Sequence, residues 1–120
     1  MTAALIDGKG YAAALRQRLL KRTERLKQLH GIVPGLAVVL VGDNPASHIY
    51  VRNKGKAAQE AGLQSFEHKL RETASQTQLL KLLAELNTDD KVDGILVQLP
   101  LPKGIDASAV IDAINPDKDV

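Results

Sequence analysis

Cysteine is absent from the 120-residue sequence, and aromatic residues make up only 2% of it. Without cysteine the chain has no disulfide, no thiolate nucleophile and no thiolate ligand for a metal. Because aromatic side chains are scarce, the hydrophobic core must be built from Leu, Val, Ile and Ala. Hydrophobic residues nevertheless reach 44% and charged residues 25%, a composition typical of one folded globular domain.

The sequence also lacks a strong net charge and a long apolar stretch. Sixteen basic and fourteen acidic residues give a formal charge of +2, which favours neither nucleic acid nor a membrane surface as a partner. Residues 1–7 lack the basic start and the apolar stretch of a signal peptide. The cytoplasm is therefore the expected location.

Three weaker patterns do not indicate a site. Basic residues between positions 16 and 27 are interrupted by Glu24 and have no aromatic platform beside them, so they indicate a solvated helix face rather than a nucleic-acid surface. The segment Gly8-Lys-Gly-Tyr-Ala-Ala13 fits the loose dinucleotide fingerprint G-x-G-x-x-A, but no convincing strand precedes it, and it predicts a helix start. No metal site is predicted, because none of the histidines has metal-ligand spacing: these are His30, His48 and His68.

Hydrophobic periodicity predicts helices that alternate with strands. Expected helices cover about residues 10–30, 45–61 and 106–114, and another begins behind the capping box of residues 75–78. Expected strands are residues 36–41, 64–70 and 94–97. This alternation predicts an α/β fold, a three-layer α/β/α domain with a small, mainly parallel sheet.

One lysine falls on the apolar side of the second predicted helix. On a helical wheel, Lys54 and three alanines lie within about 80° of Tyr50, so Lys54 is expected on the face that packs against the sheet. A lysine there must be paired, reach water or lose its charge, and burial lowers the pKa of a lysine. An amine that is easily neutralised near neutral pH is a useful general acid or base. The alanines are Ala57, Ala58 and Ala61.

Three polar side chains are expected to converge at one edge of the sheet. The helix that carries Tyr50 and Lys54 follows a strand directly, so its start lies at the carboxyl edge, where open α/β folds build their sites. Gln98 is the first residue after the third strand, which ends at the same edge if the sheet is parallel. Pattern alone also allows a lysine that merely reaches water and a glutamine that is only a loop residue, and that alternative stays open.

Several separated motifs resemble the methylenetetrahydrofolate dehydrogenase/cyclohydrolases, and together they cover essentially the whole chain. The longest is Asn44-Pro-Ala-Ser-His-Ile-Tyr-Val-Arg-Asn-Lys-Gly-Lys-Ala-Ala-Gln-Glu-Ala-Gly62, which resembles the first signature of that family. Others are Ile6-Asp-Gly-Lys9, residues 34–43, Asp93-Gly-Ile-Leu-Val-Gln-Leu-Pro-Leu-Pro102 and Pro116-Asp-Lys-Asp-Val120. Their agreement in order makes the resemblance specific.

The resemblance implies an enzyme that oxidises 5,10-methylenetetrahydrofolate to the methenyl form with NADP and hydrolyses that product to 10-formyltetrahydrofolate. Lys54 matches the catalytic lysine of the family, Tyr50 the tyrosine that stacks on the folate, and Gln98 the glutamine that hydrogen-bonds the lysine. The remaining residues expected to contact the substrate are Ser47, Val51, Arg52, Asn53, Val97 and Leu99.

The resemblance also implies how the protein is organised. Residues 1–120 are expected to form the N-terminal folate-binding, catalytic domain, whereas NADP is expected to bind a C-terminal domain outside this chain. Tetrahydrofolate one-carbon derivatives are the expected partners, and the full-length protein is expected to be a homodimer. Two other hypotheses stay open: a stand-alone folate- or anion-binding α/β module without turnover, and a structural α/β domain whose lysine only reaches water.

Overall fold

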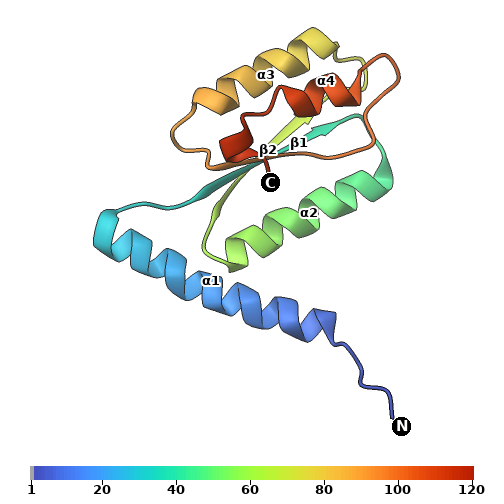
Figure 1. Ribbon diagram of the computed structural model, residues 1–120. Coiled ribbons are helices and arrows are strands. Elements are labelled where there is room, and N and C mark those ends of the chain that lie inside the picture. The colour runs from blue at the N-terminus through green and yellow to red at the C-terminus, as the bar shows by residue number, and fades with distance from the viewer. Residues whose placement is uncertain (1) are drawn as a thin grey trace.

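The computed structural model describes residues 2–120, and a three-stranded parallel sheet forms its middle layer (Figure 1). The strands are β1 (Gly35–Val41), β2 (Gln64–Leu70) and β3 (Gly94–Val97), in the order β2-β1-β3. The continuous apolar run of β1 is the central strand and is covered on both faces, as predicted. All three predicted strands are therefore confirmed.

Helices cover both faces of this sheet. Figure 1 shows α3 (Gln76–Thr88) and α4 (Ala107–Asp112) on one face, and α2 (Pro45–Glu60) on the other with α1 (Gly8–His30) beyond it. A short 3-10 helix, η1 (Pro116–Lys118), precedes the last two residues. This arrangement confirms the predicted three-layer α/β/α fold.

Alternate residues of β1 build two separate cores. Val39 packs with Leu79, Leu83 and other side chains on the α3 and α4 side. Val38 belongs to the smaller core on the other face, which contains the α2 residue Val51. Because the side chains of a strand alternate between faces, one uninterrupted apolar strand supplies both cores and holds α2 at a fixed distance from the sheet.

Asn44 fixes the start of α2 directly after the central strand. Its Oδ1 accepts hydrogen bonds from the backbone N–H groups of Ala46, at 3.0 Å, and Ser47, at 3.2 Å. Pro45 occupies the first helical position, where its missing N–H costs nothing. This cap sets the rotational phase of α2, and with it the direction in which each later side chain points.

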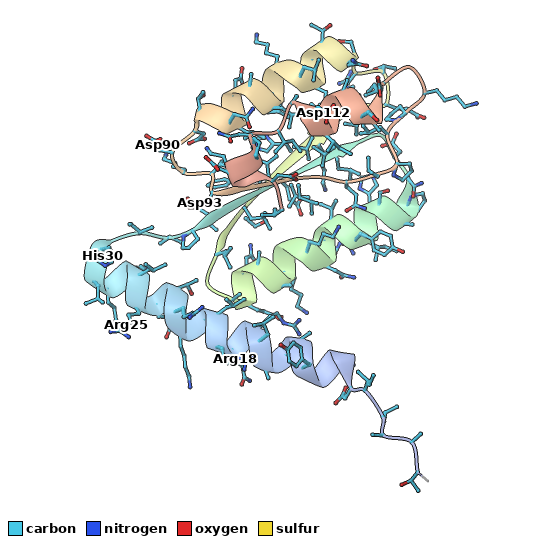
Figure 2. The ribbon with its side chains drawn as sticks, in the orientation of Figure 1. Arg18, Arg25, His30, Asp90, Asp93 and Asp112 are labelled. Atoms are coloured by element: carbon cyan, nitrogen blue, oxygen red, sulfur yellow. The ribbon has the colours of Figure 1, made fainter. Side chains whose placement is uncertain are left out.

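Asp93, labelled in Figure 2, ties the start of β3 to the start of β1. The backbone N–H of Gly35 donates to Asp93 Oδ2 at 2.9 Å, and the backbone N–H of Asp93 donates to the carbonyl of Gly35 at 2.8 Å. These bonds support the pairing of Val39 with Val97 further along the two strands. The register of β3 therefore determines where Gln98 emerges from the sheet.

Helix α1 contacts the rest of the domain through α2 and leaves much of its apolar stripe uncovered. Tyr11 is 67% exposed and Leu29 63% exposed, and the Arg18 guanidinium lies 5.9 Å from the centre of the Tyr11 ring. Figure 2 shows Arg18 and Arg25 spread along this helix. At 23 residues α1 is the longest helix, yet among residues 2–120 no helix has both the length and the apolar composition to cross a membrane.

Thr23 joins α1 to the end of α2. Its Oγ1 lies 2.8 Å from the carbonyl oxygen of Ala61 and 2.9 Å from that of Leu20, so one hydroxyl hydrogen is shared between two acceptors. Gly62 has a positive φ of 81°, and a Cβ added there would lie 2.1 Å from Thr23 Oγ1. Both the backbone conformation and the close approach of α1 therefore require glycine at this position.

We predict that Gly62→Ala lowers the free energy of unfolding by about 3 kcal/mol, because it combines a strained φ with a clash against Thr23. Gly31→Ala is the matched control, since Gly31 also has a positive φ, of 65°, but a Cβ there meets nothing within 4 Å. The control should lose only about 1 kcal/mol. Urea denaturation measures both values, and equal losses would contradict the packing of α1 described here.

Candidate functional site

The Lys54 amine and the Gln98 amide meet at the carboxyl edge of the sheet. Lys54 Nζ donates a hydrogen bond to Gln98 Oε1 at 2.6 Å. Lys54 comes from α2, and Gln98 follows β3 directly. The convergence of these two side chains, expected from the parallel sheet and separated by 44 residues in sequence, is thus present in the structure.

The Gln98 amide is held in one orientation. Its side chain is only 9% exposed, and its Nε2 donates to the carbonyl oxygen of Leu99 at 3.1 Å. Its backbone N–H donates to the carbonyl of Val39 at 2.8 Å, which extends the β1–β3 ladder by one residue. Because the amide nitrogen already has an acceptor, the amide oxygen faces the lysine, whose ammonium can only donate.

Lys54 itself is exposed, so the expectation that it packs against the sheet is wrong. The residues of α2 that face the sheet are Ser47, Val51, Gly55 and Ala58, all buried. Lys54 lies beside this stripe, and its side chain borders an apolar groove between α1 and α2 that also involves Ala57 and Leu19. Ala57 and the neighbouring alanines face α1 as well as the sheet. Their position on the helical wheel therefore did not identify the sheet-facing side. The amide of Gln98, rather than enclosure by the sheet, positions this amine.

Tyr50 lies one helical turn before Lys54 on the same side of α2, as the spacing predicts. Its side chain is 54% exposed, which leaves the ring face open to a planar ligand. Arg52 and Asn53 are also exposed. On the helical wheel Arg52 lies about 160° from Tyr50, whereas Asn53 lies about 60° from it. The expected contact of both residues with substrate stays a prediction.

Three other residues expected to contact the substrate are buried instead. Ser47 and Val51 are each 2% exposed, and Val97 is 7% exposed. Val51 and Val97 belong to the hydrophobic cores on opposite faces of the sheet. In this structure Ser47, Val51 and Val97 lie inside the domain, beneath the exposed side chains of the site. Leu99 differs from them, because it is 44% exposed and its carbonyl orients Gln98.

An apolar groove beside Lys54 was not foreseen from the sequence. It has a volume of about 350 Å³ and is lined by side chains of α1, α2, β1 and β3. Leu36 and Leu96 form its floor on neighbouring strands, and Leu15 contributes from α1. The periodic leucines of the first helix were the sequence signal for this groove. Only the packing of α1 on α2 shows that Leu15 and Leu19 line it beside Lys54.

Comparison with known proteins identifies the family. Residues 6–120 match the model of the tetrahydrofolate dehydrogenase/cyclohydrolase catalytic domain. The chain belongs to that family. The bifunctional protein FolD of Rhodopseudomonas palustris strain TIE-1 is 60% identical to it over 120 residues, which are 100% of this chain and 41% of that relative. The chain therefore spans about two fifths of the length of the curated relatives that it matches.

Solved structures of the tetrahydrofolate dehydrogenase/cyclohydrolase family have the same fold. The bifunctional enzyme FolD from Campylobacter jejuni, a methylenetetrahydrofolate dehydrogenase/cyclohydrolase, is 46% identical with a TM-score of 0.94, and the match covers 97% of this chain and 41% of that one. FolD from Trypanosoma brucei, solved with NADP cofactor and an inhibitor, is 36% identical with a TM-score of 0.93 and matches 99% of this chain and 41% of its own.

We predict that the Lys54 and Gln98 side chains are energetically coupled. In a double-mutant cycle with Lys54→Met and Gln98→Leu, the coupling in the free energy of unfolding should be about 1 kcal/mol, the net value of a partly exposed hydrogen bond. Chemical denaturation of the parent, the two single variants and the double variant provides it. Additive effects of the two substitutions would show that the bond contributes nothing to the folded state.

Proposed function

We propose that this chain is the folate-binding, catalytic part of an enzyme that oxidises 5,10-methylenetetrahydrofolate to 5,10-methenyltetrahydrofolate with NADP and hydrolyses that product to 10-formyltetrahydrofolate. The observation that carries the proposal is the 2.6 Å hydrogen bond between Lys54 Nζ and Gln98 Oε1 at the carboxyl edge of a parallel sheet. The names of the relatives, bifunctional FolD enzymes, support it. Tetrahydrofolate one-carbon derivatives are the proposed substrates.

Lys54 is the proposed proton carrier of the hydrolytic step. Water adds to the methenyl carbon and loses a proton, and one carbon–nitrogen bond then breaks to leave the formyl group on the other nitrogen. An amine at this place can take up and deliver protons during that sequence. Because Gln98 accepts one of its hydrogen bonds, the other bonding positions of the exposed amine stay available to water and substrate.

Gln98 and Tyr50 have supporting roles in this proposal. The fixed amide of Gln98 keeps the amine near the reacting carbon, and holding a group in place is a large part of catalysis. The exposed ring of Tyr50 offers an apolar face on which a flat folate ring can stack. The apolar groove beside Lys54 would exclude water from one side of the bound ring system.

The residues of this chain do not fit the dinucleotide part of NADP. A pyrophosphate turn needs a strand that leads through glycines into a helix. The only glycine pattern of that kind begins at Gly8 in the first turn of α1, and residues 2–7 before it form no strand. We infer that NADP, which would accept the hydride, binds a part of the protein outside residues 1–120.

The proposal extends to the setting of the enzyme. We infer that it acts in the cytoplasm as a homodimer, in the one-carbon metabolism that serves purine biosynthesis. These points rest on the family rather than on the site. The largely exposed apolar stripe of α1 supports some form of assembly, because a surface of this kind is usually covered by another part of a protein.

A stand-alone folate- or anion-binding module without turnover is the second candidate function. It shares the Lys54, Gln98 and Tyr50 site but performs no chemistry. We expect residues 1–120 alone to bind folate weakly and to give no NADP-dependent absorbance change in the presence of 5,10-methylenetetrahydrofolate. Substantial reduction of NADP by these residues would contradict the inference that the cofactor binds elsewhere. Methenyl hydrolysis by the complete protein separates the enzyme from the module.

We predict that Lys54→Gln in the complete protein lowers the rate of 5,10-methenyltetrahydrofolate hydrolysis at least about 100-fold, the usual contribution of a general acid or base. The loss of absorbance of the methenyl compound measures this rate. Lys81→Gln is the control with the same change of charge, since Lys81 is exposed on α3, and it should keep the parent rate. Hydrolysis that survives in a folded Lys54→Gln variant would remove Lys54 from its role.

A further inference from the structure

A polar pocket lies between α2 and β2, on the other side of the helix from Gln98. It has a volume of about 440 Å³ and is lined by α2 and β2 residues alone. Because β2 and β3 flank β1 on opposite sides, this pocket is separate from the place where Lys54 meets Gln98. Its lining residues are Arg52, Gly55, Lys56, Gln59, Ser65 and Glu67.

The Ser65 hydroxyl at the base of this pocket is buried and has no protein partner. Neighbouring Phe66 packs into the core on the α3 side, so Ser65 and Glu67 face α2. Among the side chains of residues 2–120, Ser65 Oγ is the one buried polar atom without a hydrogen bond. Buried polar groups are nearly always bonded to protein, water or a ligand, so this hydroxyl is available to a partner from outside the chain.

Gly55 places no side chain above that hydroxyl. A Cβ placed on Gly55 would lie 3.4 Å from Ser65 Oγ and 3.4 Å from Glu67 Oε1. Any other residue there would place its side chain in the pocket. The glycine thus leaves no side chain of α2 packed directly on the hydroxyl.

Two cations stand at the mouth of the pocket. Arg52 and Lys56 are one helical turn apart on α2, and neither forms an ion pair with a carboxylate of the described residues. The carboxylate of Glu67 lies 3.7 Å from Lys69 Nζ, which offsets its charge. The pocket therefore combines excess positive charge with a free hydroxyl donor, the pair of features that binds an oxyanion.

We propose that this pocket binds a small ligand through a phosphate or carboxylate group. The oxyanion accepts hydrogen bonds from Arg52, Lys56 and the Ser65 hydroxyl. The site uses neither Lys54 nor Gln98, and Arg52 is its only residue among those expected to contact the folate substrate. Its binding can therefore be present or absent whatever the outcome of the hydrolysis assay.

The test titrates the complete, ¹⁵N-labelled protein with inorganic phosphate and, separately, with succinate, while sodium chloride keeps the ionic strength constant. We expect saturable NMR shifts at the amides of Gly55, Lys56 and Ser65. A response to phosphate alone identifies a phosphate ester as the ligand class, and a response to succinate identifies a carboxylate. Lys56→Gln should weaken binding about tenfold or more.

Two further variants separate the site from general charge effects. Ser65→Ala removes the unbonded hydroxyl, so it should leave the fold intact and still weaken binding several-fold. Lys81→Gln changes the net charge as Lys56→Gln does, but on α3, and should leave binding unchanged. The proposal is overturned if neither anion gives saturable shifts, if Lys81→Gln weakens binding equally, or if the shifts centre on Lys54 and Gln98.

Discussion

A single hydrogen bond joins the two halves of the site, and the rest of the fold serves to make it possible. The amine that donates it stands on a helix on one face of the sheet, and the amide that accepts it follows the strand at one side of the sheet. A long, flexible lysine has many conformations and loses entropy when it is fixed. The bond persists because the amide is buried, has its own nitrogen bonded to Leu99 and cannot turn away.

Each partner reaches its place through a separate set of contacts. The Asn44 cap starts α2 at a fixed point after β1, and the core around Val51 presses that helix onto the sheet. On the other side, the paired bonds between Asp93 and Gly35 align β3 with β1 before the chain reaches Gln98. Parallel strands whose carboxyl ends share one edge then bring the two side chains together. The site is therefore a consequence of the topology.

Much of this arrangement could be predicted from the sequence. Buried strands read as continuous apolar runs, and the Ser75 capping box and the prolines marked element boundaries that the structure confirms. The convergence of Lys54 and Gln98 was one of two alternatives that the helical wheel and the parallel topology left open, and the structure contains it. The strands, caps and boundaries depend on local pattern, so sequence is sufficient for them, whereas the side-chain contact needed the structure.

The remaining features depend on how the helices and strands pack against one another. Hydrophobic periodicity in the sequence does not determine that packing. A helical wheel could not tell that the alanines of α2 face α1 as well as the sheet, and Gly55 at the true sheet-facing position has no side chain to mark it. The wheel therefore placed Lys54 on the sheet-facing side, whereas the alternative of a lysine that reaches water had stayed open. The amide orientation set by Leu99 and the pocket at Ser65 also depend on contacts between segments that are distant in sequence.

The most direct test of the central claim is a crystal structure of the complete protein with a stable analogue of the 5,10-bridged folate. We expect Lys54 Nζ to keep its bond to Gln98 Oε1 and to lie within about 3 Å of the one-carbon bridge or of a water beside it, with the ring of the analogue against Tyr50. An analogue bound elsewhere, or an amine turned away from both the bridge and Gln98, would contradict it.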